Sequence, residues 1–548
     1  MAENYVIGVD FGSASVRAVV VSTESGEIIS TGISSYPRWE KGLYQHAEDA
    51  IYRQHPLDYI ESLQSCVTEA VSKLSEEKRN SVIGIGVDTT GSTPAPVNRE
   101  GIPLALTVGF EENENAMFWL WKDHSAANEA KEITKLFSEN DETDYCQYQG
   151  DYSSEWFWAK ILRAVRQDSA IRENAYTWVE HSDWIAGLLC GNTNPEDIEH
   201  NACAAGHKAL WNSHWHGLPS SDVLSRLDPY LSIVRERYGQ EPLPAGSVAG
   251  KLCQEWADKL GLKAGIAIAV GSFDAHAGAV GAGIKEKTLI TTIGTSAVDM
   301  LIAKPEVVEG KNIRRYCGQA ENSIYPGFIG IETGQSAFGD IFAWFKKTLL
   351  WPVEHAILVS NEREFEKIRT ELEDNLLKWL QEEAEKLPYE PFAISLDWYN
   401  GRRYPDTDDQ QKASCKGLTL GTSAPELYRA LVFGAACGLK RICDGLENAG
   451  VEIEEVIAVG GISKKSTYVM QLLADLLNKK IIVLESDQTC ALGAAIYAAI
   501  ASGAKKDMKE ACEDMASKPI GSFRPDLNKN EIYSIKYEEY LQLTNLMS

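Results

Sequence analysis

Residues 5–22, YVIGVDFGSASVRAVVVS, decide how the rest of the chain is interpreted. An apolar run ends on Asp10, small and hydroxyl residues follow at 12–15, and a second apolar run contains Arg17. This order predicts a β-hairpin. Its turn can bind a phosphate through backbone N–H groups and serine hydroxyls, with Arg17 neutralising charge and Asp10 holding a hydrated magnesium ion. An ordinary surface hairpin explains the same residues, so this stretch alone leaves both interpretations open.

Length and charge limit the class of protein. A chain of 548 residues is too long for one core and predicts two large domains, or three. The hydrophobic content of 44% and charged content of 24% are typical of soluble globular proteins. A formal net charge of −26 disfavours nucleic acid and anionic membranes as partners.

The cysteines and the apolar runs predict the compartment. Eleven cysteines are scattered without a C-x-x-C pair, which is typical of reduced thiols. A strand is predicted almost from the first residue, so we expect no signal peptide, and no apolar run is long enough to span a bilayer. We therefore expect a cytoplasmic protein without a membrane segment.

An α/β layer architecture is predicted from the next segments. Residues 56–80 have helical periodicity, and the apolar strand 82–87 leads directly into a loop at 88–96. Ligand-binding loops in such sheets lie beyond the carboxyl ends of the strands, so this loop is a candidate wall of a site. The aromatic clusters at 116–123 and 151–160 fit either sugar contacts or core packing. Residues 201–218 are predicted to be a loop that contains Lys208.

Two later segments suggest further parts of a site. A buried strand ends at 271–274, where Asp274 is either an ordinary helix N-cap or a general base. Residues 288–303, TLITTIGTSAVDMLIA, repeat the opening design. Without gaps, Thr292 aligns with Asp10 and Asp299 with Arg17. Two such turns imply two similar domains that face one phosphate tail.

The last third of the chain is predicted to contain an exposed charged helix over 360–387, a helix over 425–449 and a strand over 456–459. Gly460 and Gly461 follow that strand, and they favour either a close approach of a planar ring or a simple tight turn. The charged tail after residue 503 is expected to pack at the periphery.

Taken in order, several blocks resemble one family. They include GVDFGSASVRAVVV, GVDTTGSTPAPV, GSFDAHAGAVGAG, IGTSAVDMLI and AVGGISKKSTYVMQLLADLLN, and the matching blocks extend from about residue 5 to 500. The chain resembles the FGGY carbohydrate kinases, and within them the pentulose kinases of arabinose catabolism. The resemblance implies an α/β fold with two actin/hexokinase-like (RNase H-type) domains around a central cleft. Residues 1–283 would hold most of the sugar site and the first phosphate loop, and residues 284–548 most of the nucleotide site.

The resemblance also implies roles for individual residues. Asp274 is expected to be the catalytic base, and Asp10 the metal-associated carboxylate. The expected nucleotide contacts are Gly12, Ser13, Arg17, Gly294, Thr295, Gly339, Gly460, Gly461 and Lys464. The expected sugar contacts are Ser92, Ala95, Trp121, Lys122, Asp123, Lys208, Asp274 and Glu332.

The reaction implied is transfer of the γ-phosphoryl group of ATP, with Mg²⁺, to the terminal 5-hydroxyl of ribulose, L-ribulose being favoured over D-ribulose. The partners would be a small pentulose and Mg-ATP, and a homodimer is left open. One alternative is another kinase of the same family that acts on D-ribulose, xylulose or ribitol. Another is an actin-like nucleotide-binding sensor without transfer activity.

Overall fold

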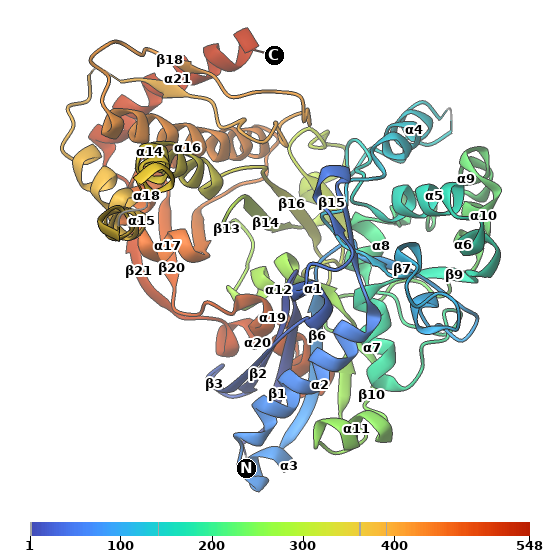
Figure 1. Cartoon of the computed structure of the whole chain (residues 1–548). Helices are drawn as coiled ribbons and strands as arrows, with labels where there is room; N and C mark the ends of the chain where they lie inside the picture. The colour runs from blue at the N-terminus through green and yellow to red at the C-terminus, as the bar shows by residue number, and fades with distance from the viewer. Residues whose placement is uncertain (1–2, 141, 361–362, 391, 548) are drawn as a thin grey trace.

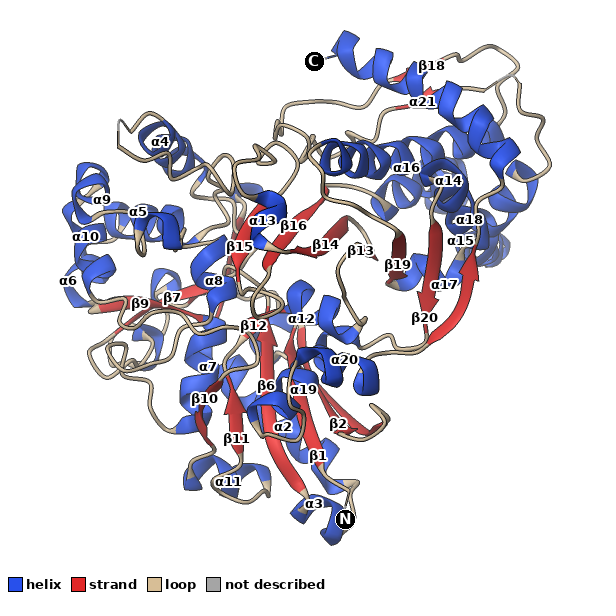
Figure 2. Cartoon of the chain, turned by 180° about the vertical axis from the view of Figure 1, so that it is seen from behind, coloured by secondary structure: helices blue, strands red, loops and turns tan. Residues whose placement is uncertain are grey.

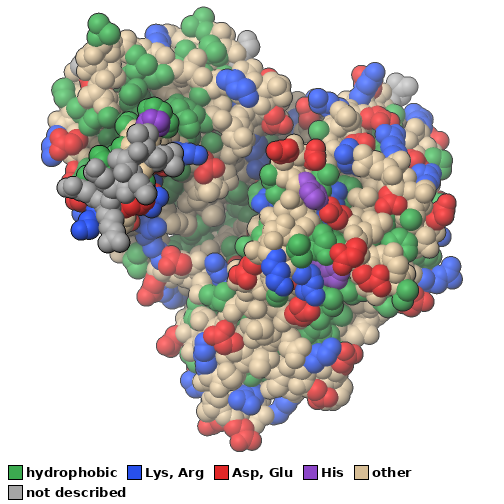
Figure 3. Space-filling view, viewed as in Figure 1, with side chains coloured by type: hydrophobic (Ala, Val, Ile, Leu, Met, Phe, Trp, Pro, Cys, Tyr) green, Lys and Arg blue, Asp and Glu red, His purple; other side chains and the backbone are tan. Residues whose placement is uncertain are grey.

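The computed structural model describes residues 3–140, 142–360, 363–390 and 392–547. The chain forms two lobes, each built on one large sheet, with the N-terminus in one lobe and the C-terminus in the other (Figures 1 and 2). The space-filling view shows a hollow between the lobes (Figure 3). We call residues 1–283 the first half and residues 284–548 the second half.

The first sheet has the order β10-β11-β6-β1-β2-β3, with β12 pairing with β6. Its strands are β1 (Tyr5–Phe11), β2 (Ser15–Ser22), β3 (Ile28–Ser35), β6 (Val82–Thr89), β10 (Val248–Lys251), β11 (Ala267–Ala269) and β12 (Ser272–Phe273). β1 pairs antiparallel with β2, which confirms the opening hairpin, and parallel with β6. The strands β1 and β6 are buried along nearly their whole length, as expected for central parallel strands.

The second sheet has the order β15-β16-β14-β13-β19-β20-β21. Its strands are β13 (Thr288–Ile293), β14 (Ala297–Ala303), β15 (Gly318–Glu321), β16 (Ile329–Gln335), β19 (Glu455–Val459), β20 (Lys480–Leu484) and β21 (Pro519–Phe523). From β16 to β21 the strand directions repeat those of the first sheet from β3 to β10. The two sheets therefore share one topology.

The ungapped alignment of the two hairpins is wrong in its second strand. In the first hairpin Asp10 pairs with Arg17, whereas in the second Thr292 pairs with Val298. The second turn is one residue shorter, because Gly294 donates to the carbonyl of Ser296 at 2.9 Å. By position in the sheet, Arg17 therefore corresponds to Val298 and not to Asp299.

Helix α19 (Thr489–Ala501) lies in the second half of the sequence but packs against β1 and β6 of the first sheet and against α12 (Asp274–Gly281). Glycines in β1 and β6 make this close packing possible. A Cβ atom on Gly8 would lie 1.8 Å from the carbonyl oxygen of Ala491, and one on Gly86 would lie 2.0 Å from that of Ala494. Figure 1 shows α19 beside α12 and the N-terminal strands. The C-terminal part of the chain thus stabilises the sheet that carries the N-terminal turn.

Some helices of the first half pack against the first sheet, and others pack against one another beside it. Besides α12 the helices of the first half are α1 (Pro37–Glu40), α2 (Pro56–Ser72), α3 (Glu76–Asn80), α4 (Ala127–Ser138), α5 (Phe157–Gln167), α6 (Ser169–Asn174), α7 (His181–Cys190), α8 (Ala202–His207), α9 (Ser221–Leu227), α10 (Pro229–Glu236) and α11 (Gln254–Leu260). The single helix predicted over 56–80 is divided into α2 and α3. Part of the loop predicted over 201–218 is helix α8, which ends just before Lys208. Short strands β4 (Gln45–His46), β5 (Ile51–Gln54), β7 (Pro94–Val97), β8 (Phe118–Trp119) and β9 (Thr177–Glu180) connect these helices.

The helices of the second half enclose the second sheet. Besides α19 they are α13 (Pro305–Val308), α14 (Gly339–Ser360), α15 (Arg363–Ala384), α16 (Ala424–Asn448), α17 (Gly461–Lys465), α18 (Thr467–Leu477), α20 (Met508–Met515) and α21 (Leu527–Met547), with short strands β17 (Ile394–Ser395) and β18 (Cys415–Lys416). The helix predicted over 360–387 is α15, which is mostly exposed, and residues 361–362 of that prediction lie outside the described residues.

The prediction of a peripheral tail is wrong. β21 extends the second sheet beside β20, and Tyr540 of α21 is buried and donates to Asp397 at 2.7 Å. Of the helices that the structure describes, none is both long and apolar enough to cross a membrane.

Candidate active site

Three carboxylates lie at the carboxyl ends of neighbouring parallel strands. Asp10 on β1 pairs with Asp88 on β6, and Asp88 pairs in turn with Ser272 on β12. Asp274 follows two residues later as the first residue of α12. Because these strands are parallel, their ends meet at one edge of the sheet, which is where ligands bind in α/β folds.

This carboxylate group is short of positive charge. Asp88 is completely buried, and neither of its oxygens has a hydrogen-bond donor among the described residues. Burial, together with the charges of Asp10 and Asp274, raises the pKa of Asp88 well above its usual range. Burial also raises the pKa of Asp10. Adjacent carboxylates in a buried site are stable only when a proton or a cation lies between them.

Asp274 does not act as a helix N-cap. The N-cap position belongs to Phe273, and the Asp274 Oδ1 accepts from the backbone N–H of the next residue, Ala275, at 2.6 Å. A capping side chain would instead accept from a residue two or three positions further on. Burial, and then the charge of Asp10, raises the pKa of Asp274 to about 7. A carboxylate in this range is suited to accept a proton near neutral pH.

The turn of the first hairpin is bound by side chains of two other segments of the first half. The indole N–H of Trp121 donates to the hydroxyl of Ser13 at 2.8 Å, and the amide of Gln54 donates to the Ser13 carbonyl at 2.7 Å. The Gly12 N–H closes the turn on the carbonyl of Ser15 at 3.0 Å. Arg17 is exposed and makes no ion pair with any part of the chain that the structure describes. Its guanidinium is therefore available to an anion.

The second turn lies against two other glycine positions. The backbone N–H of Gly339 donates to the carbonyl of Gly294 at 3.0 Å, and the N–H of Asp340 donates to that of Thr295 at 3.0 Å. Gly460 has a φ of 93°, and a Cβ there would lie 2.6 Å from the carbonyl oxygen of Ile293. The structure thus brings the second turn, the start of α14 and the end of β19 together.

Gly461 and Lys464 extend this region. No atom lies within 4 Å of a Cβ built on Gly461, so its surroundings are open. The Lys464 ammonium pairs with Asp487 at 2.6 Å and donates to the carbonyl of Glu485 at 2.5 Å. A nucleotide would have to compete with Asp487 for this lysine.

A charged bridge connects the two halves near Asp274. Lys208, just after α8, pairs with Glu332 of β16 at 3.0 Å, and Arg403 lies 3.5 Å from the same carboxylate. Burial disfavours the charge of Glu332, but Lys208, two nearby histidines and Arg403 outweigh that effect and hold its pKa well below its usual range. The Lys208–Glu332 ion pair therefore stays ionised. It offers polar groups to a small ligand near the carboxylate of Asp274.

Comparisons with known proteins identify the family of the chain. The N-terminal domain of the FGGY family of carbohydrate kinases matches residues 5–281, and the C-terminal domain of the same family matches residues 289–502. The chain belongs to the FGGY family of carbohydrate kinases. It is an ATP-using sugar kinase with two actin/hexokinase-like domains, as the sequence predicts.

Named relatives of this FGGY kinase cover its whole length. It is 43% identical to a ribulokinase of Vibrio parahaemolyticus over 99% of this chain and 95% of that protein. It is 35% identical to a ribulokinase of Halalkalibacterium halodurans, again over 99% and 95% of the two chains.

Solved structures share the fold at low identity. A xylulose kinase of Rhodospirillum rubrum has a TM-score of 0.80 at 18% identity, covering 99% of both chains. The Plasmodium falciparum glycerol kinase with ADP has a TM-score of 0.78 at 17% identity, covering 99% of this chain and 98% of the other.

Several expected sugar contacts of the FGGY kinase have side chains in the interior. The Ser92 hydroxyl donates to the carboxylate of Glu180, and Ala95 is fully buried in β7. Asp123 pairs with Arg53, and its other oxygen accepts from Ser125. Direct sugar contacts by these three side chains stay predictions.

Lys122 and the clustered tryptophans have other surroundings. The Lys122 ammonium lies 4.3 Å from the ring centre of Tyr52, and burial lowers its pKa. Trp119 and Trp158 are completely buried, so these members of the two aromatic clusters belong to the core. Trp121 is partly exposed and is bound to the first turn.

Two residues near the candidate site were given no individual role from the sequence, although Asp88 begins the loop at 88–96 that was predicted to be a wall of the site. Asp88 follows the apolar strand at 82–87 as Asp10 follows its own strand, so this repeated pattern is the signal that identifies it. Lys160 is completely buried in α5 and donates to the carbonyl of Ser92 at 2.7 Å and that of Leu120 at 2.9 Å. It connects the loop after β6 with the segment that carries Trp121. No sequence pattern identifies this lysine, because only the tertiary structure brings those carbonyls together.

Proposed function

We propose that this FGGY kinase transfers the γ-phosphoryl group of ATP to the terminal 5-hydroxyl of ribulose, with L-ribulose favoured, as a step of L-arabinose catabolism. The partly buried carboxylate of Asp274, placed between the carboxylate edge of the first sheet and the Lys208–Glu332 bridge, carries the proposal. The identity of 43% to a protein named ribulokinase supports ribulose as the acceptor.

Asp274 is the proposed catalytic base. It orients the acceptor hydroxyl and accepts its proton as the new O–P bond forms. Phosphoryl transfer has a loose transition state, so holding the hydroxyl in line contributes more than basicity does. Lys208 and Glu332 are proposed to bind the sugar hydroxyls, supported by their position beside Asp274 on both halves.

The two turns are the proposed phosphate clamp. Gly12, Ser13 and Gly294 with Thr295 would present backbone N–H groups and hydroxyls to the phosphate oxygens, and Arg17 would neutralise charge on the transferring group. The adenosine would lie against Gly339, Gly460 and Gly461, with Lys464 nearby. The open surroundings of Gly461 support this placement.

Asp10 and Asp88 fit a magnesium ion that accompanies ATP. Asp88 has two buried oxygens without a donor among the described residues, and oxygen ligands are those that Mg²⁺ prefers. When bound, the ion would screen the charge of the phosphates. The protein's part is to hold the two carboxylates in register, and the charge of the ion would favour their ionised forms against the effect of burial.

The proposal also includes the division of the chain at residues 283 and 284 and a cytoplasmic location. The matches at 5–281 and 289–502 support the division, with α19 crossing to the first sheet. Eleven free cysteines support a reducing compartment.

The experiment is a coupled ADP-release assay with L-ribulose, D-ribulose, L-xylulose, D-xylulose, ribitol and glycerol. We expect the highest kcat/KM with L-ribulose and the product to be the 5-phosphate by NMR. A higher kcat/KM for xylulose or ribitol would assign another FGGY sugar kinase activity. Binding of ATP and ribulose without ADP release would instead indicate a sensor.

A further inference from the structure

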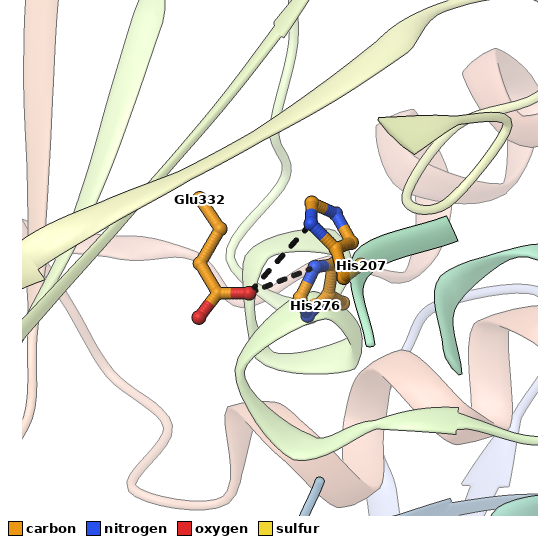
Figure 4. Close-up of side chains that lie close together, drawn as sticks. All are labelled: His207, His276 and Glu332. Atoms are coloured by element: carbon orange, nitrogen blue, oxygen red, sulfur yellow. Dashed lines mark ion pairs between the residues drawn. The ribbon is translucent and has the colours of Figure 1, made fainter. Parts of the chain in front are cut away.

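Two histidines and a glutamate meet where the two halves touch (Figure 4). His207 ends α8, His276 lies in α12, and Glu332 lies in β16. The Glu332 Oε2 is 3.8 Å from the Nδ1 of His207 and 3.9 Å from the Nε2 of His276. Figure 4 shows both rings on one side of the carboxylate. The reaction proposed above uses neither histidine.

His207 has a hydrogen-bond partner at each ring nitrogen. Its Nε2 lies 3.2 Å from the hydroxyl of Ser323, which donates to the carbonyl of Ala320 at 3.1 Å. Its Nδ1 lies 3.4 Å from the Oε1 of Gln149, whose amide nitrogen donates to the carbonyl of Gly206. When the Ser323 hydroxyl donates to Ala320, the Nε2–H of His207 donates to Ser323, and the Nδ1 has a lone pair that faces Glu332. In that tautomer the Nδ1 can bind a metal ion.

His276 faces the same carboxylate. Its side chain is 2% exposed, and neither ring nitrogen has a hydrogen-bond partner among the described residues. Burial lowers the pKa of His276 to about 4 and holds that of His207 well below its usual range. Burial therefore favours the neutral form of both rings, which is the form that binds metal ions. A buried imidazole without partners is costly unless another group occupies the position that it faces.

We propose that His207, His276 and Glu332 bind one Zn²⁺ ion, with the Oε1 of Gln149 beside it. Two neutral imidazoles and a carboxylate form a ligand set typical of zinc, and the Nε2–H of His207 bound to Ser323 is the outer contact that orients such a ligand. Tetrahedral coordination with bond lengths of about 2.0–2.2 Å places ligand atoms about 3.4 Å apart, so the Oε2 of Glu332 and the two imidazoles must approach by about half an ångström from 3.8 and 3.9 Å. The flexible carboxylate of Glu332 allows this movement.

The positive charge of Lys208 repels a cation bound to Glu332, so Zn²⁺ binding would affect how Lys208 and Glu332 bind the sugar. The Lys208 ammonium lies 3.0 Å from Oε2 and 3.3 Å from Oε1 of Glu332, so an ion on Oε2 moves the ammonium towards Oε1. Zinc would also tie α8 and α12 of the first half to β16 of the second half. Resting on the proposed function, the expected consequence is inhibition that is competitive with ribulose, since Glu332 and Lys208 are then withdrawn from the sugar.

The binding experiment needs neither sugar nor nucleotide. The full chain is titrated with Zn²⁺ by calorimetry and with Co²⁺ by absorption spectroscopy, in the absence of Mg²⁺. We expect one ion per chain and Co²⁺ bands without a thiolate charge-transfer band, which excludes the cysteines. His276→Asn should weaken binding on the order of 100-fold, whereas His216→Asn, at an exposed histidine, should leave it unchanged.

A variant that should bind Zn²⁺ more tightly serves as a second test, because a misfolded variant would lose affinity and not gain it. Lys208→Gln removes a competing positive charge and should tighten Zn²⁺ binding by about tenfold or more. Equal affinities of wild type and His276→Asn, or no binding of Co²⁺ to the wild type, would overturn the proposal. A protein that binds zinc but does not phosphorylate ribulose would refute the proposed reaction and leave the zinc site intact.

Discussion

The two sheets have the same strand order and directions, yet their central strands end in different side chains. In the first sheet β1 and β6 end near Asp10 and Asp88, and β2 carries Arg17. At the corresponding positions the second sheet has Thr292, Val459 and Val298. The shared topology places a tight turn at the ligand-binding edge of each sheet. The side chains then determine which turn is charged.

This difference has a physical reason. Two carboxylates on adjacent strands repel each other, and burial makes that repulsion more costly. Such a pair persists where a cation or a positively charged side chain compensates for it. The second sheet instead ends in glycines that let backbone segments approach, as Gly460 does against Ile293. A cation held by the two carboxylates, together with Arg17, is suited to a phosphate group. A glycine backbone without side chains is suited to the close approach of a flat ring.

The largest expected effect is on the carboxylate edge that only the first sheet has. Asp274→Asn should lower kcat on the order of 10³-fold, because the base is lost while hydrogen bonding is kept. ATP and ribulose affinities, measured by calorimetry, should stay within a few-fold. The matched control is Asp299→Asn in the second sheet, which removes a buried carboxylate outside the proposed site and should change kcat little. Near-full activity of Asp274→Asn would refute the base.

The next effect tests the register of the hairpins. Arg17→Val gives the first hairpin the residue that the second has at that position. We expect kcat to fall on the order of 10²-fold, since a charge that stabilises the transferring group is lost. The KM for ribulose should change little, and Arg17→Lys should recover part of the loss. Steady-state kinetics with an unchanged kcat would show that Arg17 does not act on the phosphate.

A smaller effect is expected on the glycine side. Gly460→Ala places a Cβ at a φ of 93° and 2.6 Å from a backbone oxygen, so the end of β19 must shift. The KM for ATP should rise by about tenfold, because the proposed adenosine wall moves. Gly461→Ala is the control, since no atom lies within 4 Å of its Cβ. Equal KM values for the two variants would contradict this assignment.

The smallest effect concerns stability in acid. Nine of the ten histidines lie in the first half, and His181 is buried there against Tyr59 with a ring distance of 3.7 Å. Burial holds the pKa of His181 well below its usual range, so the unfolded chain binds a proton that the folded chain does not. Folding stability therefore falls as the pH drops below about 6.5.

His181→Phe should remove this dependence. At pH 8 we expect a free energy of unfolding within about 1 kcal/mol of wild type. Between pH 8 and pH 5.5, the free energy of unfolding of wild type should fall by about 1.4 kcal/mol more than that of the variant. This is the linkage expected one pH unit below the pKa of histidine in the unfolded chain. Urea unfolding at both pH values measures it. An identical pH slope in both proteins would show that His181 is protonated in the folded state.

Sequence reasoning was most successful where local signals were strong. The opening hairpin, its repeat and the strand before Gly460 follow from apolar runs and glycine, which act over a few residues. The ordered blocks also predicted the kinase family. The register of the second hairpin was missed, because a turn shortened by one residue leaves the apolar pattern almost unchanged. The peripheral tail was mispredicted because pairing of β21 with β20 depends on a distant strand.

The sequence by itself therefore determined the two hairpins, the α/β class and the family, because these depend on residues close together in the chain. Only the tertiary structure decided that Asp88 joins Asp10, that Lys160 connects two walls of the site, and that α19 crosses to the first sheet. It also decided that two histidines meet Glu332. Each of these contacts joins segments far apart in sequence, and their formation depends on packing and burial, which local patterns do not record.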